Sequence, residues 1–248
     1  MNTAKAIAIF MILWQIGAWV VGNTLIMPGL LEVTSGVLSL VVSFNFMESI
    51  ADTLFMMVLS WTTITIAMFV ILLLSTVSTN FREITYNLFL GLQPTPSFAW
   101  LPMFMLILGI NEVTLLTMLT FTGLCYIVPN FLAAIGTSLE KWKKHCRNLD
   151  MGLLKSIYLV YLPSMRDVLL ANFKTAWNLS WRTLVALEVV FGSIGSHWGI
   201  GTYMVTMKDR MDITEMYASL FIIIAIGVLV SALFEKLGSL QRNKSYGT

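Results

Sequence analysis

The chain has 248 residues, of which 57% are hydrophobic and 11% are charged, and its net charge is +2. Soluble domains usually contain about 25% charged residues, so this chain lacks the polar surface that a water-soluble globule needs. We therefore expect an all-α protein that crosses a membrane several times, and the charge gives no reason to expect a nucleic-acid partner.

Six segments are candidates for membrane-spanning helices, each of which needs about 20 mostly apolar residues. They are residues 4–22, 53–77, 84–110, 113–136, 168–191 and 216–237. The first segment resembles a signal peptide, but no small-residue cleavage site follows it, so we interpret it as a retained helix. Residues 28–50 are only mildly apolar and predict an interfacial or external helix.

The third candidate segment is interrupted by Pro94 and Pro96. Each proline removes a backbone donor and disfavours helix in the residue before it. A break at membrane depth persists where it is buried in protein or lines a water-filled cavity. Two interpretations follow, namely part of a solute path or two short pieces packed inside the bundle.

The placement of charge predicts the orientation, because cytoplasmic loops are enriched in Lys and Arg. The segment before the second span is acidic and has no Lys or Arg, and its carboxylates are Glu32, Glu48 and Asp52. Basic residues expected on the other side are Arg82, those of segment 139–167, and Lys236, Arg242 and Lys244. Six spans with both termini in the cytoplasm fit this alternation, with Lys208 and Arg210 as exceptions.

Catalytic residues are scarce. The two histidines, His145 and His197, are predicted to lie on opposite sides of the membrane, so neither a metal site nor a catalytic triad is expected. No phosphate-binding loop of the Gly-Lys-Ser/Thr kind occurs. We expect a non-catalytic chain without a cofactor.

The fifth span contains Lys174, Arg182 and Glu188. Ionisable groups inside a membrane are costly and are often functional. Arg182 and Glu188 are six residues apart, about 120° around a helix, so they are not expected to pair with each other. They face either a water-filled path or a neighbouring helix, and a long side chain can also extend to the interface. The following glycine-dense segment, 192–201, is consistent with a flexible loop or with a tightly packed turn.

Segment 139–167 contains six basic residues between two apolar segments: Lys141, Lys143, Lys144, Arg147, Lys155 and Arg166. One interpretation is a solvated loop that marks the cytoplasmic side. The other is a short amphipathic helix that docks a soluble partner through apolar anchors, which are Trp142, Leu149, Met151 and Leu153.

Taken in order, these features resemble the permease subunits of bacterial binding-protein-dependent ABC importers of the type I fold, and within them the nitrate, sulfonate and taurine branch. Four segments carry the resemblance: Pro28 to Val33, Pro96 to Pro102 with Gly109, Trp181 with Glu188, and Gly199 to Gly201. The resemblance extends over most of the chain.

The cytoplasmic signature of that family reads Glu-Ala-Ala, three residues, Gly, nine residues, Ile, one residue, Leu-Pro. Counting back from Leu162 and Pro163 places Val160 at the Ile and Asp150 at the Gly. Lys-His-Cys at 144–146 then replaces Glu-Ala-Ala. A loop two residues shorter would put Gly152 at the glycine position instead.

The resemblance implies a single permease domain over residues 1–248, in which 139–163 form a cytoplasmic coupling helix that docks an ATPase. The docking residues would be Trp142, Lys144, Arg147, Leu149, Asp150, Met151 and Gly152. The implied partners are two ATPase subunits, a second permease chain (identical or different), an external solute-binding protein and membrane lipid. The expected location is the bacterial inner membrane.

The implied solute path runs between the broken third helix and the fifth helix, along Thr95, Trp100, Asn178, Trp181, Arg182 and Glu188. Arg182 would attract a small organic or inorganic anion, such as a sulfonate. A secondary transporter or channel without an ATPase is the alternative, because broken helices and buried charge also suit that class.

Overall fold

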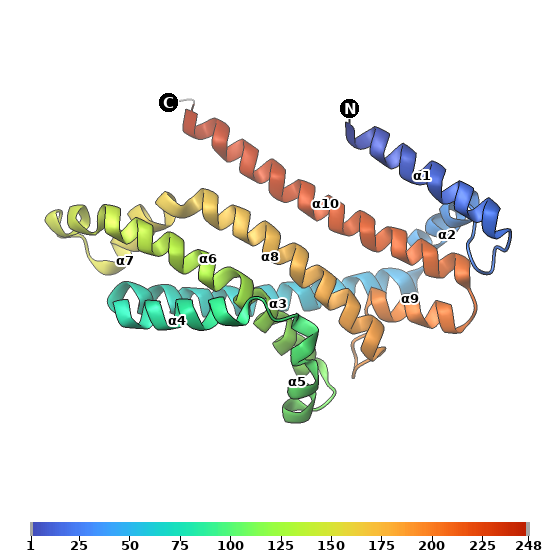
Figure 1. The fold of residues 1–248 in the computed structure, drawn as a ribbon, viewed down its shortest axis with the longest axis horizontal. Coiled ribbons are helices and arrows are strands. Elements are labelled where there is room, and N and C mark those ends of the chain that lie inside the picture. The colour runs from blue at the N-terminus through green and yellow to red at the C-terminus, as the bar shows by residue number, and fades with distance from the viewer. Residues whose placement is uncertain (1, 247–248) are drawn as a thin grey trace. The chain divides into compact units, whose positions relative to one another are not determined.

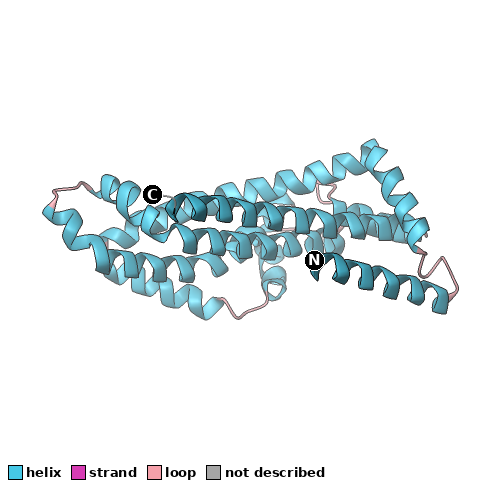
Figure 2. Ribbon diagram, turned by 90° about the horizontal axis from the view of Figure 1, so that it is seen from above, coloured by secondary structure: helices cyan, strands magenta, loops and turns pink. Residues whose placement is uncertain are grey.

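The computed structural model describes the backbone of residues 2–246, and the side chains of residue 5, residues 8–234 and residue 236. Figure 2 shows helices joined by short loops. Within the described residues no β-strand occurs, and an isolated bridge joins Ile194 and His197. The all-α prediction is confirmed. The side chains of Arg242 and Lys244, which the predicted orientation used, lie outside the described ones.

The helices follow one another in the order seen in Figure 1. They are α1 (Asn2–Val21), α2 (Leu30–Val42), α3 (Phe44–Val77), α4 (Thr79–Leu92), the 3₁₀ turn η1 (Ser97–Trp100), α5 (Leu101–Leu108), α6 (Glu112–Asn148), α7 (Leu153–Ser156), the π-helical turn η2 (Ile157–Tyr161), α8 (Leu162–Phe191), α9 (Ile200–Asp209) and α10 (Ile213–Tyr246).

Three stretches of the described chain are long and apolar enough to cross a membrane: Phe44–Val77, Glu112–Asn148 and Ile213–Phe234. Shorter apolar helical stretches include Ala8–Val21 and Ser97–Leu108. The structure thus supports several spans, and the number six stays a prediction.

Two helices extend beyond their predicted ends. α3 begins at Phe44 and not at residue 53, so the predicted external segment is divided between α2 and the first turns of α3. α6 continues to Asn148 through residues that the sequence predicted to be a loop. Neither extension contains Gly or Pro, and Leu, Glu and Lys at 139–144 favour helix. The charged residues at 139–144 are therefore part of α6, and the helix does not stop where the charge begins.

The predicted break in the third segment is confirmed. α4 ends at Leu92, residues 93–96 are non-helical, and the chain resumes through η1 and α5. Gly109, with φ of 81°, ends α5. Asn111 then caps α6, because its side chain accepts a hydrogen bond from the Thr114 amide at 3.0 Å.

The chain divides into two compact units. Unit 1 comprises Met1–Met56 and Leu184–Leu229, and unit 2 comprises Met57–Thr183 and Val230–Thr248. Helices α3, α8 and α10 each contribute residues to both units. Within unit 2, α4 lies along α6, and α5 packs against α6 (Figure 1). The core of unit 2 is built from buried apolar side chains, including Ile64, Ile127, Val128, Phe131 and Ile135.

Unit 1 is held by aromatic and small residues. The Trp14 ring lies edge-on to Tyr217 and Phe221, with centroids 5.2 Å away in each case. Its indole N–H donates to the Pro28 carbonyl at 3.1 Å, which ties α1 to the segment that begins α2. At Gly36 a β-carbon would come within 3.1 Å of Ala218, so the absence of a side chain lets α2 and α10 approach closely.

Candidate functional site

The basic segment forms a sharp turn at the end of α6. Asp150 has a left-handed backbone with φ of 46°. Its amide donates to the Arg147 carbonyl at 3.1 Å, and the Met151 amide donates to the Cys146 carbonyl at 3.0 Å. This pair of bonds is the Schellman motif, whose left-handed position is most often occupied by Gly. Asp150 therefore occupies a position that is built for glycine.

That backbone distinguishes the two registers left open by the sequence. Gly152 has φ of −59°, a conformation that any residue adopts. Asp150 has the conformation that favours glycine, so the backbone supports the register in which Asp150 replaces the glycine of the importer signature.

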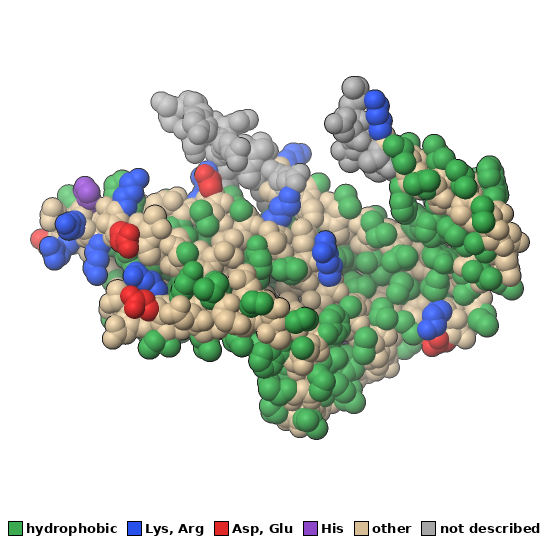
Figure 3. Space-filling view, viewed as in Figure 1, with side chains coloured by type: hydrophobic (Ala, Val, Ile, Leu, Met, Phe, Trp, Pro, Cys, Tyr) green, Lys and Arg blue, Asp and Glu red, His purple; other side chains and the backbone are tan. Residues whose placement is uncertain are grey.

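The predicted docking residues lie on the last turns of α6 and on this turn, and they do not form a separate helix. α7 is a single turn that leads through η2 directly into α8. Lys144, Arg147 and Leu149 are exposed, and Leu149 is 72% exposed. Figure 3 shows Lys and Arg side chains gathered at the end of unit 2 that bears α7.

An apolar cavity of about 550 Å³ lies among these charges. Its lining residues are Trp142, His145, Cys146, Leu149, Met151, Leu159, Val160, Pro163 and Ser164. Apolar surface surrounded by charge is typical of a protein-docking surface. The geometry is thus suited to a soluble protein partner.

A second polar centre lies in unit 1, around Glu188. This residue is 1% exposed. Its Oε1 accepts a hydrogen bond from the Thr53 hydroxyl at 2.8 Å and lies 2.9 Å from His197 Nε2. Its Oε2 accepts from the Gly201 amide at 2.9 Å. A buried carboxylate is stable only with such partners. The described contacts of Glu188 are therefore contacts with other parts of the same chain.

Two glycines nearby are required by close contacts with α8. A β-carbon at Gly199 would overlap the Glu188 carboxylate, and one at Gly201 would lie 2.6 Å from the Val185 carbonyl oxygen. The Ile200 amide donates to the Thr53 hydroxyl at 2.8 Å. The first amides of α9 are therefore satisfied by side chains of α3 and α8, and a negative charge at a helix N-terminus is favourable.

Of the two interpretations of segment 192–201, the structure supports the tightly packed turn. Backbone hydrogen bonds join Ile194 and His197 in both directions, at 3.2 and 2.9 Å. Gly195, with φ of 60°, supplies the left-handed conformation that the turn requires. The His197 side chain is buried.

The predicted path residues of unit 2 are scattered. Thr95 is exposed in the break, and Arg182 is exposed on α8. The Trp100 ring contacts Phe121, with centroids 5.3 Å apart. Asn178 accepts a hydrogen bond from the Ser231 hydroxyl at 2.9 Å, while Trp181 is buried. Among the described contacts of unit 2, no hydrogen bond or ring contact joins any two of the five path residues, so the path stays a prediction.

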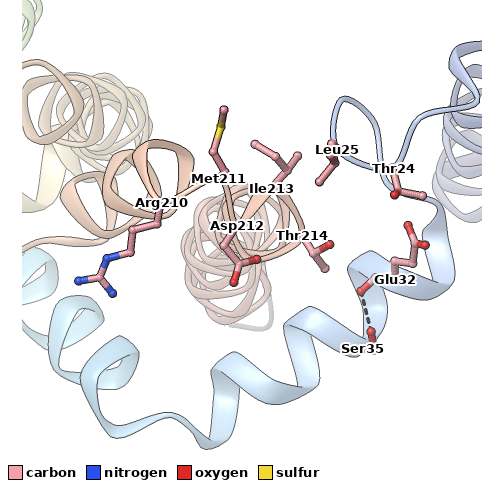
Figure 4. Close-up of a pocket in the computed structure, with 9 residues that line it drawn as sticks. All are labelled: Thr24, Leu25, Glu32, Ser35, Arg210, Met211, Asp212, Ile213 and Thr214. Carbon is pink, nitrogen blue, oxygen red and sulfur yellow. Dashed lines mark hydrogen bonds between the residues drawn. The ribbon is translucent and has the colours of Figure 1, made fainter.

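Two cavities in unit 1 were not predicted from the sequence. One of about 480 Å³ is lined by the loop after α1, by α2 and by the turn between α9 and α10. Figure 4 shows Glu32 and Ser35 on one side of it and Asp212 and Thr214 on the other. In the sequence, Glu32 contributed only to the predicted orientation.

The other cavity, of about 580 Å³, is lined by residues that include Glu48, Asp52, Arg210 and Glu215. The Tyr203 hydroxyl donates to the Glu215 carboxylate at 2.9 Å. Burial, and secondly this carboxylate, raise the pKa of Tyr203 well above its usual range, so the phenol stays a donor. Among the side chains that the structure describes, no three His, Cys, Asp or Glu residues are grouped as metal ligands would be.

Long apolar helices, a proline-broken segment and a basic turn at one end define a multi-spanning helical membrane protein. Residues 53–240 match the model of the family described as the binding-protein-dependent transport system inner membrane component. The chain belongs to this family, whose members are transport permeases, and the resemblance inferred from the sequence is confirmed.

A characterised relative is the nitrate import permease protein NrtB of Leptolyngbya laminosa. It is 23% identical over 146 residues, which cover 59% of this chain and 51% of the relative. The match thus spans about half the length of that protein. The similarity is to a permease of the nitrate branch.

Proposed function

We propose that this chain is the permease subunit of an ATP-driven importer and forms the path for a small anion. Family membership supports a transport permease, and a relative whose name specifies nitrate import supports an anion. ATP hydrolysis would take place in two separate ATPase subunits. A second permease chain and an external solute-binding protein would complete the complex in the bacterial inner membrane.

The observation that carries this proposal is the turn at Asp150. Its left-handed backbone lies where the importer signature has glycine, and Leu162 and Pro163 follow at the spacing of that signature. Exposed Lys144 and Arg147 beside an apolar cavity provide the means to dock the ATPase from the cytoplasm.

The docking role is tested by co-purification of this chain with a co-expressed ABC ATPase subunit from the same genome. Replacing residues 144–152 by a Gly/Ser linker should abolish the association. K144E should weaken the association, whereas the matched control K208E should not. Both variants make the same change of charge, but Lys208 is exposed on α9 and is predicted to face outward. Unchanged co-purification of the linker variant would rule out this docking surface.

Solute uptake tests the path and the transporter class together. Uptake of nitrate should require ATP and the ATPase, and R182A should weaken it, because an exposed cation attracts an anion over several ångströms. ATP-independent uptake would instead support a secondary transporter or channel. Normal affinity and rate in R182A would exclude Arg182 from the path.

A further inference from the structure

A groove of about 670 Å³, lined by both apolar and polar side chains, lies between α6 and α8, entirely within unit 2. Its lining residues are Asn130, Ala133, Ala134, Thr137, Ser138, Lys141, Trp142, Ser164, Met165, Val168 and Asn172. On α8, residues 164, 168 and 172 recur every four positions, so they share one helix face. The groove therefore follows α6 from Asn130 to Trp142 and α8 from Ser164 to Asn172.

The chemistry of the lining favours a negative ligand. Lys141 is the charged residue among the eleven, and none of them is Asp or Glu. The Lys141 ammonium lies 5.1 Å from the centroid of the Trp142 ring, which keeps it beside the groove. An anion in this groove would meet a cation and no carboxylate.

One donor in the groove is unused. The Asn172 side-chain nitrogen is buried and has no hydrogen-bond partner. Its neighbours are satisfied, since the Asn130 amide donates to the Tyr126 carbonyl at 3.0 Å and the Ser138 and Ser164 hydroxyls are 2.6 Å apart. Leaving a buried N–H unpaired is costly, so such a group in a cavity indicates a missing acceptor.

We propose that this groove is an oxyanion subsite on the solute path, in which the Asn172 amide donates to the anion and Lys141 supplies the compensating charge. Nitrate and sulfonate groups present several acceptor oxygens around one negative charge, and such hydrogen bonds are among the stronger ones. This inference rests on the proposed function and adds residues that the predicted path lacked.

The test uses the full chain, purified into discs of phosphatidylcholine. Sodium nitrate and sodium methanesulfonate are titrated by calorimetry at constant ionic strength. The wild type should bind at least one of them, and N172L should bind about tenfold more weakly, as expected for one lost hydrogen bond to a charged ligand. N172D keeps the shape of the side chain but adds repulsion, so it should bind more weakly still. K141Q should weaken binding, because it removes the positive charge beside the groove.

Thermal unfolding provides the matched control. N172L removes a donor without a partner, so its melting temperature should stay the same or rise. The same substitution at the α6 cap, N111L, breaks the bond to the Thr114 amide and should lower the melting temperature while leaving anion affinity unchanged.

Equal affinity of N172L, N172D and the wild type would overturn the subsite, and so would a wild type that binds neither anion. A lipid phosphate offers the same acceptor oxygens. Retention of phosphatidylglycerol by the wild type but not by K141Q and N172L, without binding of either small anion, would overturn the subsite in favour of a lipid site. Failure of co-purification with the ATPase would contradict the proposed function separately.

Discussion

A single carboxylate on α8 connects α3 with the start of α9 through hydrogen bonds. Glu188 on α8 binds the Thr53 hydroxyl of α3 and the Gly201 amide of α9, and His197 Nε2 lies 2.9 Å from the same carboxylate oxygen that Thr53 binds. The sequence drew attention to Glu188 as an isolated charge in an apolar helix. The structure explains its burial by these partners, of which His197 and Gly201 belong to the tight turn at 192–201 and Thr53 belongs to α3.

Replacing Gly199 by alanine should destabilise the protein by roughly 2 kcal/mol, because the added methyl group would overlap the Glu188 carboxylate. Thermal unfolding followed by circular dichroism measures the loss. The matched control is G136A, since a β-carbon at Gly136 meets nothing within 4 Å. Equal melting temperatures of the two variants would contradict the close approach at Gly199.

At Asp150, in contrast to Gly199, we expect a substitution to stabilise the protein. Glycine adopts a left-handed backbone without steric cost, so D150G should raise the free energy of unfolding by about 1 kcal/mol. The control G152A changes a residue with an ordinary backbone and open space around it, and should have little effect. A destabilised D150G variant would indicate that the aspartate side chain has a role of its own.

At the scale of elements, α9 is the helix that depends most on its surroundings. It has ten residues, and isolated helices of that length are marginal. Its first amides donate to Thr53 and Glu188 rather than to water. These side chains of α3 and α8 fix where α9 begins.

Removing the Thr53 hydroxyl should therefore loosen the start of α9. We expect hydrogen exchange at the Ile200 amide to become up to about tenfold faster in T53V, the equivalent of one hydrogen bond. Exchange followed by mass spectrometry of peptides that cover 194–205 measures this. T65V, an exposed threonine on the same helix, should leave these peptides unchanged. Similar acceleration in both variants would exclude a specific role for Thr53.

Sequence reasoning predicted those elements whose signals are local. The break at Pro94 and Pro96 follows from the chemistry of proline, and the apolar stretches give the long helices. The end of α6 was missed because charged helix formers were interpreted as a loop. Counting from Pro163 found Asp150, and the backbone dihedral angles support it over Gly152. The pairing of Glu188 with Thr53 was unpredictable, because nothing local links residues 135 positions apart.

At the scale of the whole molecule, the predicted orientation places the basic turn in the cytoplasm and segment 192–201 outside. Single cysteines test this, since both native cysteines, Cys125 and Cys146, are buried and give a low background. K143C should react with an impermeant maleimide only after the membrane is opened. S193C should react in intact cells, because both positions are exposed. Labelling of both from the same side would exclude the predicted topology.

The contact between Glu188 and Gly199 also has an evolutionary consequence. The two positions share one volume, so a longer residue at 199 is compatible only with a shorter one at 188. A shorter residue at 188 in turn leaves Thr53, His197 and the Gly201 amide without their acceptor. Substitution at any of these positions is therefore a coupled event, and in related chains we expect them to change as a set or to stay fixed together.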